Sequence, residues 1–208
     1  MPSGGVPDIV VGRLPVYLRA LTHMAASGQE ITSSHELGQK LGISSAQIRK
    51  DLSHFGEFGK QGTGYRISHL QEQIERILKV DREWEVALIG IGDLGHAVAR
   101  YNGFKNRGFR ISLLFDNDPA KIGMRVGDLE ILEAARLKDV LRERGIKMVM
   151  ITVPASEAQR VVDSCVEAGV EAVLNYAPIS LAVPEGVRVQ YLDPVVHLQR
   201  MTYYLAPD

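Results

Sequence analysis

Cysteine is almost absent from this sequence, and long apolar runs are lacking altogether. The single cysteine, Cys165, excludes an intramolecular disulfide and a cysteine-based metal cluster, and its apolar helical surroundings predict a small core residue. The six histidines show no spacing typical of metal ligands, so no metal site is expected. No apolar run approaches the length of a membrane span, and the N-terminus lacks the apolar core of a signal peptide. These absences favour a cytoplasmic protein that has no membrane partner.

A strong net charge is also lacking, since 24 Lys and Arg face 25 Asp and Glu in 208 residues. The charges are nevertheless uneven: residues 1–80 carry nine basic and seven acidic side chains, against fifteen and eighteen over residues 81–208. This mild basic excess does not by itself indicate nucleic-acid binding. The composition, 45% hydrophobic and 24% charged, is typical of one large globular domain or two small ones.

A glycine-rich motif in the middle of the chain is typical of dinucleotide-binding βαβ units. Gly90, Gly92 and Gly95 follow an apolar run at 86–89, and a second apolar run ends in Asp116, 21 residues after Gly95. One glycine makes the tight turn, one lets a pyrophosphate approach the backbone, and one lets the helix pack close to the strand. Asp116, rather than Asp118, is expected to accept hydrogen bonds from a ribose diol, which favours NAD(H) over NADP(H). The expected cofactor contacts from this motif are Gly90, Ile91, Gly92, Asp93, Leu94, Gly95 and Asp116. A structural turn that binds nothing is the alternative.

The first 80 residues predict three helices, of which the last two form a helix-turn-helix. After a loose leader over residues 1–8, an apolar pattern from Leu14 predicts a helix with Pro15 in its first turn, ended by Gly28. Residues 32–34 offer an N-cap for a short helix over 36–41. Ser44 and Gln47 form a capping box for the next helix, whose apolar face ends before Gly56.

The third helix and the segment after it predict a winged DNA-binding surface. Three glycines at positions 59, 62 and 64 lie between two short β segments, which together make a hairpin wing. Gln can read adenine edges, and Arg or Lys can read guanine or hold phosphate. The expected DNA contacts are Ser44, Ser45, Gln47, Arg49, Lys50 and His54 on the helix, with Lys60 and Arg66 in the wing. The alternative is a solvated helix with ordinary charge.

From residue 85 onward, strands and helices alternate, which predicts a parallel sheet covered by helices. A linker helix over 67–80 connects this part to the first one. The expected fold class is α/β: a winged helix-turn-helix domain over 1–80, a Rossmann-type domain over 81–192 and a C-terminal helix over 193–208. The expected strands are 85–90, 110–116, 129–132, 147–153, 170–175 and 187–192, and the expected helices are 93–101, 134–144, 156–168 and 195–205.

No convincing catalytic constellation accompanies the glycine motif, so the chain is not expected to be an enzyme. Tyr101 and Lys105 have the Y-x-x-x-K spacing of short-chain dehydrogenases, but they fall directly after the first helix rather than far downstream. His96 is expected to pack or to face solvent. Two alternatives remain open at this point: an NAD-dependent oxidoreductase with an N-terminal appendage, and a sensor of another adenine nucleotide such as a coenzyme A derivative.

The motifs together resemble the Rex family of redox-sensing transcriptional repressors. The resemblance runs in order through S-A-Q-I-R-K-D-L-S-H-F-G at 45–56, G-x-G-Y at 62–65, G-I-G-x-L-G at 90–95 and F-D-x-D-P-x-K-I-G at 115–123. It continues through T-V-P at 152–154 and N-Y-A-P at 175–178 to Asp193 before a C-terminal helix. It therefore covers nearly the whole chain.

The resemblance implies a homodimer whose winged helices bind an inverted-repeat operator in double-stranded DNA when NADH is scarce. NADH would close the dimer and release DNA, whereas NAD⁺ would compete without the same release. The C-terminal helix would be exchanged between subunits, and Arg19 and Asp193 match a switch salt bridge between domains. Tyr101 matches a position that senses the nicotinamide, and the residues matching pocket loops are Thr152, Val153, Pro154, Asn175, Ala177 and Pro178.

Three positions depart from the family pattern. Asp93 puts an acid near the expected pyrophosphate, and it is expected to point outward. Lys60 and Gln61 replace a wing pattern in which the basic residue usually adjoins the glycine, so Lys60 is the expected minor-groove contact. Pro194 stands where a larger apolar side chain is often found, which bears on contacts to the partner's nicotinamide.

Overall fold

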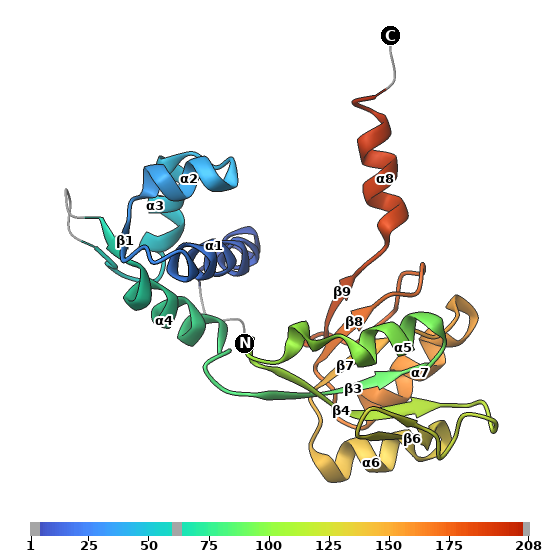
Figure 1. The fold of residues 1–208 in the computed structure, drawn as a ribbon. Coiled ribbons are helices and arrows are strands. Elements are labelled where there is room, and N and C mark those ends of the chain that lie inside the picture. The colour runs from blue at the N-terminus through green and yellow to red at the C-terminus, as the bar shows by residue number, and fades with distance from the viewer. Residues whose placement is uncertain (1–4, 60–63, 206–208) are drawn as a thin grey trace. The chain divides into compact units, whose positions relative to one another are not determined.

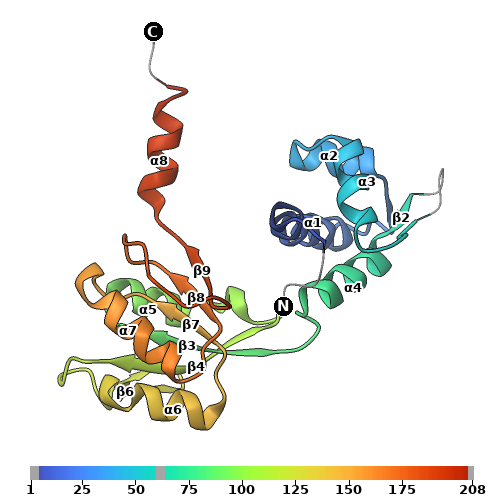
Figure 2. The ribbon, with the colours of Figure 1, turned by 180° about the vertical axis from the view of Figure 1, so that it is seen from behind.

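The computed structural model describes residues 5–59 and 64–205 and divides the chain into two compact units, Met1–Arg82 and Glu83–Asp208. Figures 1 and 2 draw the helices and strands of both units from opposite sides. Among the described helices, none is long and apolar enough to cross a membrane. The described residues also contain no cluster of three or more His, Cys, Asp or Glu that could hold a metal ion.

The first unit is a small helical domain with one short strand pair. Its elements are α1 (Asp8–Ala26), β1 (Ile31–Thr32), α2 (Ser34–Leu41), α3 (Ser45–Ser53), β2 (Tyr65–Arg66) and α4 (Ile67–Leu78). Helix α1 packs against α2 and α4, and α2 packs against α3. The buried core takes side chains from all four helices, among them Leu14, Leu37, Ile48 and Leu70. The helix-turn-helix predicted from the sequence is thus confirmed as α2 and α3.

The predicted N-caps of these two helices are confirmed. Ser33 Oγ accepts from the Glu36 N–H, and Ser44 Oγ accepts from the Gln47 N–H at 3.2 Å. A capping box also requires the Gln47 side chain to bond the backbone N–H of Ser44. This part of the prediction is wrong, because the Gln47 amide donates to Asp51 instead. Both caps satisfy N–H groups that a helix start otherwise leaves unpaired.

The predicted start of the first helix is wrong. Helix α1 begins at Asp8 rather than at Leu14, so Pro15 lies inside the helix. Pro15 has no backbone N–H and so removes one hydrogen bond from the helix. The helix nevertheless extends N-terminal to Pro15, because Val10, one turn before Leu14, is buried and its packing stabilises the first turns. Strand β2, which follows the wing glycines, pairs antiparallel with β1. The tip of the predicted wing hairpin lies outside the described residues, so the hairpin stays a prediction. Lys60 lies outside the described residues.

The second unit is an open sheet with helices on both faces. Its strands are β3 (Trp84–Ile89), β4 (Phe109–Asp116), β5 (Arg125–Val126), β6 (Leu129–Glu133), β7 (Met148–Ile151), β8 (Ala172–Asn175) and β9 (Arg188–Tyr191). Its helices are α5 (Asp93–Arg100), α6 (Leu137–Arg144), α7 (Ala155–Glu167) and α8 (Pro194–Thr202), with 3₁₀ turns at Asn102–Phe104 and Ala134–Arg136. All described strand pairs of this sheet are parallel except the edge pair of β5 with β6.

The strand order, β5-β6-β4-β3-β7-β8-β9, fixes where a ligand can bind. From β3 the chain moves outward through β4 to β6, then returns to the other side of β3 through β7. This reversal is the topological switch point of a doubly wound fold, and ligands bind at the carboxyl ends of the strands beside it. The Rossmann-type sheet predicted from the sequence is therefore confirmed, with β5 as an additional edge strand.

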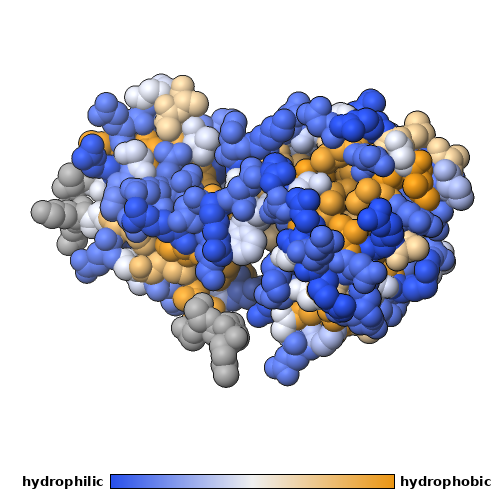
Figure 3. Space-filling model, turned by 90° about the horizontal axis from the view of Figure 1, so that it is seen from below, coloured by the Kyte–Doolittle hydropathy of each residue, from blue (hydrophilic) through white to orange (hydrophobic). Residues whose placement is uncertain are grey.

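Two apolar clusters hold the helices on the two faces of the sheet. One joins strand residues such as Ile89 and Phe115 to α6 and α7, and it contains Cys165, which is fully buried as predicted. The other joins Val86 and Leu114 to α5 through Val98. On the face of the molecule drawn in Figure 3, polar side chains predominate and apolar ones show between them. Helix α8 differs from the other helices of this unit because none of its residues is buried.

Candidate functional site

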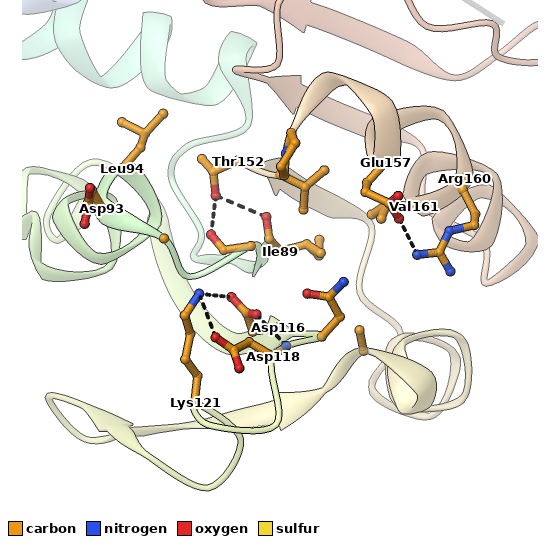
Figure 4. Close-up of a pocket in the computed structure, with 16 residues that line it drawn as sticks. Ile89, Asp93, Leu94, Asp116, Asp118, Lys121, Thr152, Glu157, Arg160 and Val161 are labelled. Atoms are coloured by element: carbon orange, nitrogen blue, oxygen red, sulfur yellow. Dashed lines mark hydrogen bonds and ion pairs between the residues drawn. The ribbon is translucent and has the colours of Figure 1, made fainter.

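A pocket of about 530 Å³ opens at the carboxyl ends of β3, β4 and β7, beside the switch point (Figure 4). Its lining comprises Ile89, Gly90, Gly92, Asp93, Leu94, Asp116, Asn117, Asp118, Lys121, Ala134, Thr152, Val153, Pro154, Glu157, Arg160 and Val161. Eight of these residues belong to the cofactor contacts expected from the sequence. Helices α5 and α7 both begin at this pocket. The unpaired backbone N–H groups of their first turns favour an anionic ligand there.

The three glycines of the motif have different surroundings, as their predicted roles require. Gly90 has φ +94°, and a Cβ there would lie 2.7 Å from Val153 Cγ1. A Cβ on Gly95 would lie 2.0 Å from the Gly90 oxygen, so only glycine lets α5 approach the turn. A Cβ on Gly92 would meet nothing within 4 Å. Gly92 therefore keeps open the space in front of α5, which is the space a pyrophosphate needs.

Asp116 at the end of β4 is bound to the glycine loop. Its Oδ2 accepts from the Ile91 N–H at 2.6 Å and lies 3.3 Å from Lys121 Nζ, and its Oδ1 accepts from the Asp118 N–H at 2.9 Å. Burial raises the pKa of Asp116, but the two backbone N–H groups and Lys121 outweigh burial and bring the pKa below its ordinary value. The carboxylate is therefore ionised and holds the loop between β3 and α5.

The opposite wall of the pocket follows β7. Thr152 Oγ1 donates to the carbonyls of Ile89 and Gly90, at 3.1 and 2.7 Å, and so ties this wall to the glycine loop. Figure 4 shows Glu157 and Arg160 paired on α7, across the pocket from the Asp116 and Lys121 cluster. Asp93 is exposed and also lines the pocket, in the first turn of α5.

The structure does not bring every expected cofactor residue to the pocket wall. Ile91 and Gly95 are buried behind it, and Tyr101 is 57% exposed and stacks edge-on against Phe104. Asn175 is fully buried, and its amide bonds the Ala177 backbone and the Ile179 carbonyl within its own loop. Ala177 is buried and Pro178 is exposed, and neither lines the pocket. Asn175 in this structure shapes a loop rather than offering a polar group to a ligand.

The other eight residues of the lining were not among the expected cofactor contacts: Ile89, Asn117, Asp118, Lys121, Ala134, Glu157, Arg160 and Val161. Lys121 was visible as the lysine of D-x-D-P-x-K, but nothing in that spacing showed that its ammonium reaches back to Asp116. Glu157 and Arg160 lie in the first two turns of α7, so their position follows from the start of that helix after Pro154.

Helix α3 carries the side chains expected to contact DNA. Arg49, Lys50 and His54 are exposed, as is Arg66 on β2. Ser44 is exposed, whereas Ser45 and Gln47 are half-buried. Arg49 Nη1 donates to Ser34 Oγ of α2 at 3.0 Å, which limits the directions that its side chain can take. The structure thus places a short polar and basic face on the second helix of the helix-turn-helix, where such proteins read the major groove.

An ion pair between Arg13 of α1 and the buried Asp51 of α3 was not predicted. Asp51 is fully buried, and Arg13 of α1 donates to both of its oxygens, through Nε at 2.5 Å and Nη2 at 2.7 Å. The Tyr17 hydroxyl donates to Oδ2 and the Gln47 amide to Oδ1. Burial raises the pKa of Asp51, but the bonds from Arg13, Tyr17 and Gln47 outweigh it and lower the pKa. This network joins α1 to the candidate recognition helix.

The two expected switch residues lie in different units. Arg19 is exposed on α1 of the first unit. Asp193 precedes α8 in the second unit and caps that helix, since its Oδ1 accepts from the Val195 N–H at 2.9 Å. The salt bridge between them therefore stays a prediction. The exposed apolar residues at and after α8 are Val195, Val196, Leu198, Met201, Tyr203, Tyr204 and Leu205.

A dinucleotide-type pocket and a basic helix-turn-helix within one chain define a ligand-responsive DNA-binding protein. Comparison with known proteins agrees for each unit separately. A family model described as "Putative DNA-binding protein N-terminus" matches residues 5–53, and one described as "CoA binding domain" matches residues 81–179.

Full-length relatives make the assignment more specific. A redox-sensing transcriptional repressor Rex from Chloroflexus aurantiacus is 55% identical over 97% of this chain and 95% of its own length, and one from Streptomyces griseus is 42% identical over 97% and 80%. The crystal structure of RSP in complex with beta-NAD+ and operator DNA matches with a TM-score of 0.93 at 33% identity, covering 98% of this chain and 94% of that one. RSP in complex with beta-NADH matches with a TM-score of 0.88 at 32% identity, covering 96% and 94%. The chain belongs to the Rex family of redox-sensing transcriptional repressors.

Proposed function

We propose that this protein represses transcription by binding an inverted-repeat operator through α3, and that NADH bound in the pocket of the second unit releases it. The observation that carries the proposal is the glycine loop, in which Gly92 leaves open space in front of α5 while Gly90 and Gly95 are sterically required. That arrangement fits a pyrophosphate better than a purely structural turn, since a structural turn has no need of the open position.

The residues around the pocket fit a dinucleotide. Gly92 and the N-terminus of α5 would hold the pyrophosphate. Asp116 Oδ1 accepts one hydrogen bond in the described structure, so it retains a lone pair for a ribose hydroxyl. Thr152, Val153 and Pro154 would form the wall opposite the glycine loop. Tyr101 is proposed to sense the nicotinamide, with Asn175, Ala177 and Pro178 shaping the loop beside it.

The redox response must come from the nicotinamide ring, because the rest of the cofactor is unchanged between its two forms. The ring of NAD⁺ is positively charged and that of NADH is neutral, so a closed apolar pocket disfavours NAD⁺ through desolvation. Each tenfold preference needs only about 1.4 kcal/mol. NADH switches the protein only if it binds the DNA-free form better than the DNA-bound form, since equal binding to both shifts nothing.

The proposal includes a homodimer, since an inverted repeat presents two equivalent half-sites. We propose that α8 is exchanged between subunits, where its exposed apolar residues would be buried, and that Arg19 and Asp193 form the switch salt bridge. We also propose the cytoplasm as the site of action, because the relatives from Chloroflexus aurantiacus and Streptomyces griseus are bacterial repressors and operator DNA lies in that compartment.

The test is fluorescence anisotropy of a labelled AT-rich inverted-repeat duplex, titrated with protein and then with NADH or NAD⁺. Release by NADH but not by NAD⁺ is expected. If NADH and NAD⁺ both leave DNA binding unchanged, the protein binds DNA but the proposed response to NADH is wrong. Competition with coenzyme A tests the adenine-nucleotide alternative, and turnover of hydroxy acids or aldehydes with NAD⁺ would favour an oxidoreductase instead.

A further inference from the structure

We propose that Arg13 and Asp51 are positioning residues that fix the side-chain amide of Gln47, so that Gln47 offers its carbonyl oxygen to DNA and prefers an amino-bearing base. This inference rests on the proposed function of α3. Arg13 and Tyr17 lie on α1, whereas the expected DNA contacts lie on α3, so residues of one helix would determine which base the other favours.

The carboxylate of Asp51 is completely occupied. An ionised carboxylate accepts about four hydrogen bonds and donates none. Asp51 receives four from the described structure: Arg13 Nη2 and Gln47 Nε2 on Oδ1, and Arg13 Nε and Tyr17 OH on Oδ2. The two bonds from Arg13 are parallel and charge-assisted, which makes them strong and directional. The carboxylate is therefore held from α1 and does not rotate freely.

Asp51 in turn dictates the orientation of the Gln47 amide. Because Asp51 offers only acceptors, the NH₂ of Gln47 must face it, as the 2.7 Å bond from Nε2 to Oδ1 shows. The two residues are four apart on α3, the spacing that brings side chains together along a helix. The amide oxygen then points away from Asp51, and in the described part of the chain it accepts no hydrogen bond.

The free oxygen defines a base preference. In the major groove, adenine N6 and cytosine N4 are hydrogen-bond donors, whereas guanine O6 and thymine O4 are acceptors. An acceptor oxygen on Gln47 pairs with the amino bases A or C and opposes the keto bases G or T. If the amide were free to turn over, its NH₂ could satisfy a keto base instead, and the preference would be lost. The Arg13 and Asp51 pair thus turns the amide oxygen of Gln47, rather than its NH₂ group, away from the protein, and the side chain then favours an amino base.

The experiment selects operator sequences with the full-length protein from a duplex library that carries a randomised inverted repeat. Wild type is expected to enrich A or C about tenfold over G or T at one position in each half-site. Gln47→Met, which has a similar shape but no polar atoms, and Asp51→Asn, whose own amide can donate to Gln47, should both reduce that preference to about twofold or less. The double variant should lose no more than either single one, because both act through one contact.

Tyr17→Phe is the matched control. The Tyr17 hydroxyl donates to Oδ2 and the Gln47 amide to Oδ1, so its removal costs one hydrogen bond to the same carboxylate without freeing Gln47. This variant should keep the amino-base preference of wild type. Loss of the preference in Tyr17→Phe to the same degree as in Asp51→Asn would contradict a specific effect on Gln47.

Two outcomes overturn the inference. The first is an Asp51→Asn protein that binds all sequences more weakly but keeps the amino preference, and the second is a Gln47→Met protein that keeps it. Circular dichroism checks the fold of each variant. If Asp51→Asn does not fold, Arg13→Lys replaces it, because lysine keeps the positive charge but cannot form the two parallel hydrogen bonds. An unchanged base preference in Arg13→Lys would also contradict the inference. If wild type enriches no inverted repeat, the proposed function itself fails, and NADH binding by each variant shows independently that the second unit is intact.

Discussion

The carboxylate of Asp116 accepts a 2.6 Å hydrogen bond from the backbone N–H of Ile91, which joins the end of β4 to the loop that follows β3. The two residues are 25 positions apart in the chain and lie on neighbouring strand ends. We therefore propose two functions for Asp116 in the pocket. It holds the glycine loop in place, and it leaves an acceptor on Oδ1 for a ligand.

Asp116→Asn is expected to weaken NADH binding about tenfold, since a hydrogen bond to a charged group typically contributes about 1.5–3 kcal/mol. Operator affinity without nucleotide should stay close to wild type. Isothermal titration with NADH and anisotropy with operator DNA measure the two properties. Asp128→Asn, on an exposed turn outside the pocket lining, is the control. Equal NADH affinity in both variants would show that Asp116 does not contribute to the nucleotide site.

Gly92→Ala and Gly95→Ala should separate ligand access from folding. A Cβ at 95 would lie 2.0 Å from the Gly90 oxygen, so Gly95→Ala should lower the melting temperature of the second unit. A Cβ at 92 meets no protein atom within 4 Å, so Gly92→Ala should fold normally but lose NADH affinity. Thermal unfolding with and without NADH distinguishes the two. A Gly92→Ala protein stabilised by NADH as strongly as wild type would argue against a pyrophosphate at this loop.

Arg49→Ala combined with Lys50→Ala should abolish specific operator binding while NADH still binds. Each phosphate contact removed should also flatten the dependence of log K on log salt by about 1. Lys40→Ala, an exposed lysine at the end of α2, is the control for simple loss of positive charge. Anisotropy across a range of salt concentrations provides the measurement, and an unchanged operator affinity would place DNA recognition on another surface.

The stability of the first unit should depend on pH through Asp51. The pKa of Asp51 is lowered in the folded protein, so its ion pair stabilises the fold fully above the ordinary carboxyl pKa of about 3.9 and loses this effect as pH falls through the folded value. The free-energy gap in urea unfolding between wild type and Asp51→Asn should therefore narrow from neutral pH to about pH 3. A gap that stays constant over this range would mean that the charge of Asp51 contributes nothing to stability.

Cys165 should be unreactive in the native protein. Burial raises the pKa of its thiol to about 12, and the thiolate is the form that reacts with alkylating reagents. Iodoacetamide at pH 8 should label the urea-unfolded chain and leave the folded chain unlabelled over the same time, as mass spectrometry would show. Fast labelling of the folded protein would contradict the burial of α7 against the sheet.

The sequence predicted the second unit well because its signals are local and periodic. The glycine spacing, the apolar runs before it and Asp116 at the end of the next strand all fall within one βαβ unit, and the strands of that unit lie within a residue of the expected positions. Strand β5 was missed, as was β1 in the first unit. A strand of two residues has no periodicity to read, and each of these depends on a partner strand for its existence.

What the sequence could not show were contacts that span long separations. Asp51 lies in a polar stretch between Lys50 and a buried leucine, and its spacing gives no indication of burial. Its partner Arg13 is 38 residues earlier, on a helix that was predicted to begin after it. The pairing of β2 with β1 depends in the same way on how α1 ends and returns the chain. Local patterns fix which face of a helix is apolar, but they do not fix which polar residue finds a distant partner.

The absence of buried residues in α8 has a consequence for how much protein is needed. If α8 is buried by a second chain, as proposed above, its ordering has a molecularity of two. Operator binding would then also require two chains, if both half-sites must be occupied together. Below the concentration at which chains associate, repression would be lost even with NADH absent. The redox response would therefore require a minimum number of protein copies in the cell.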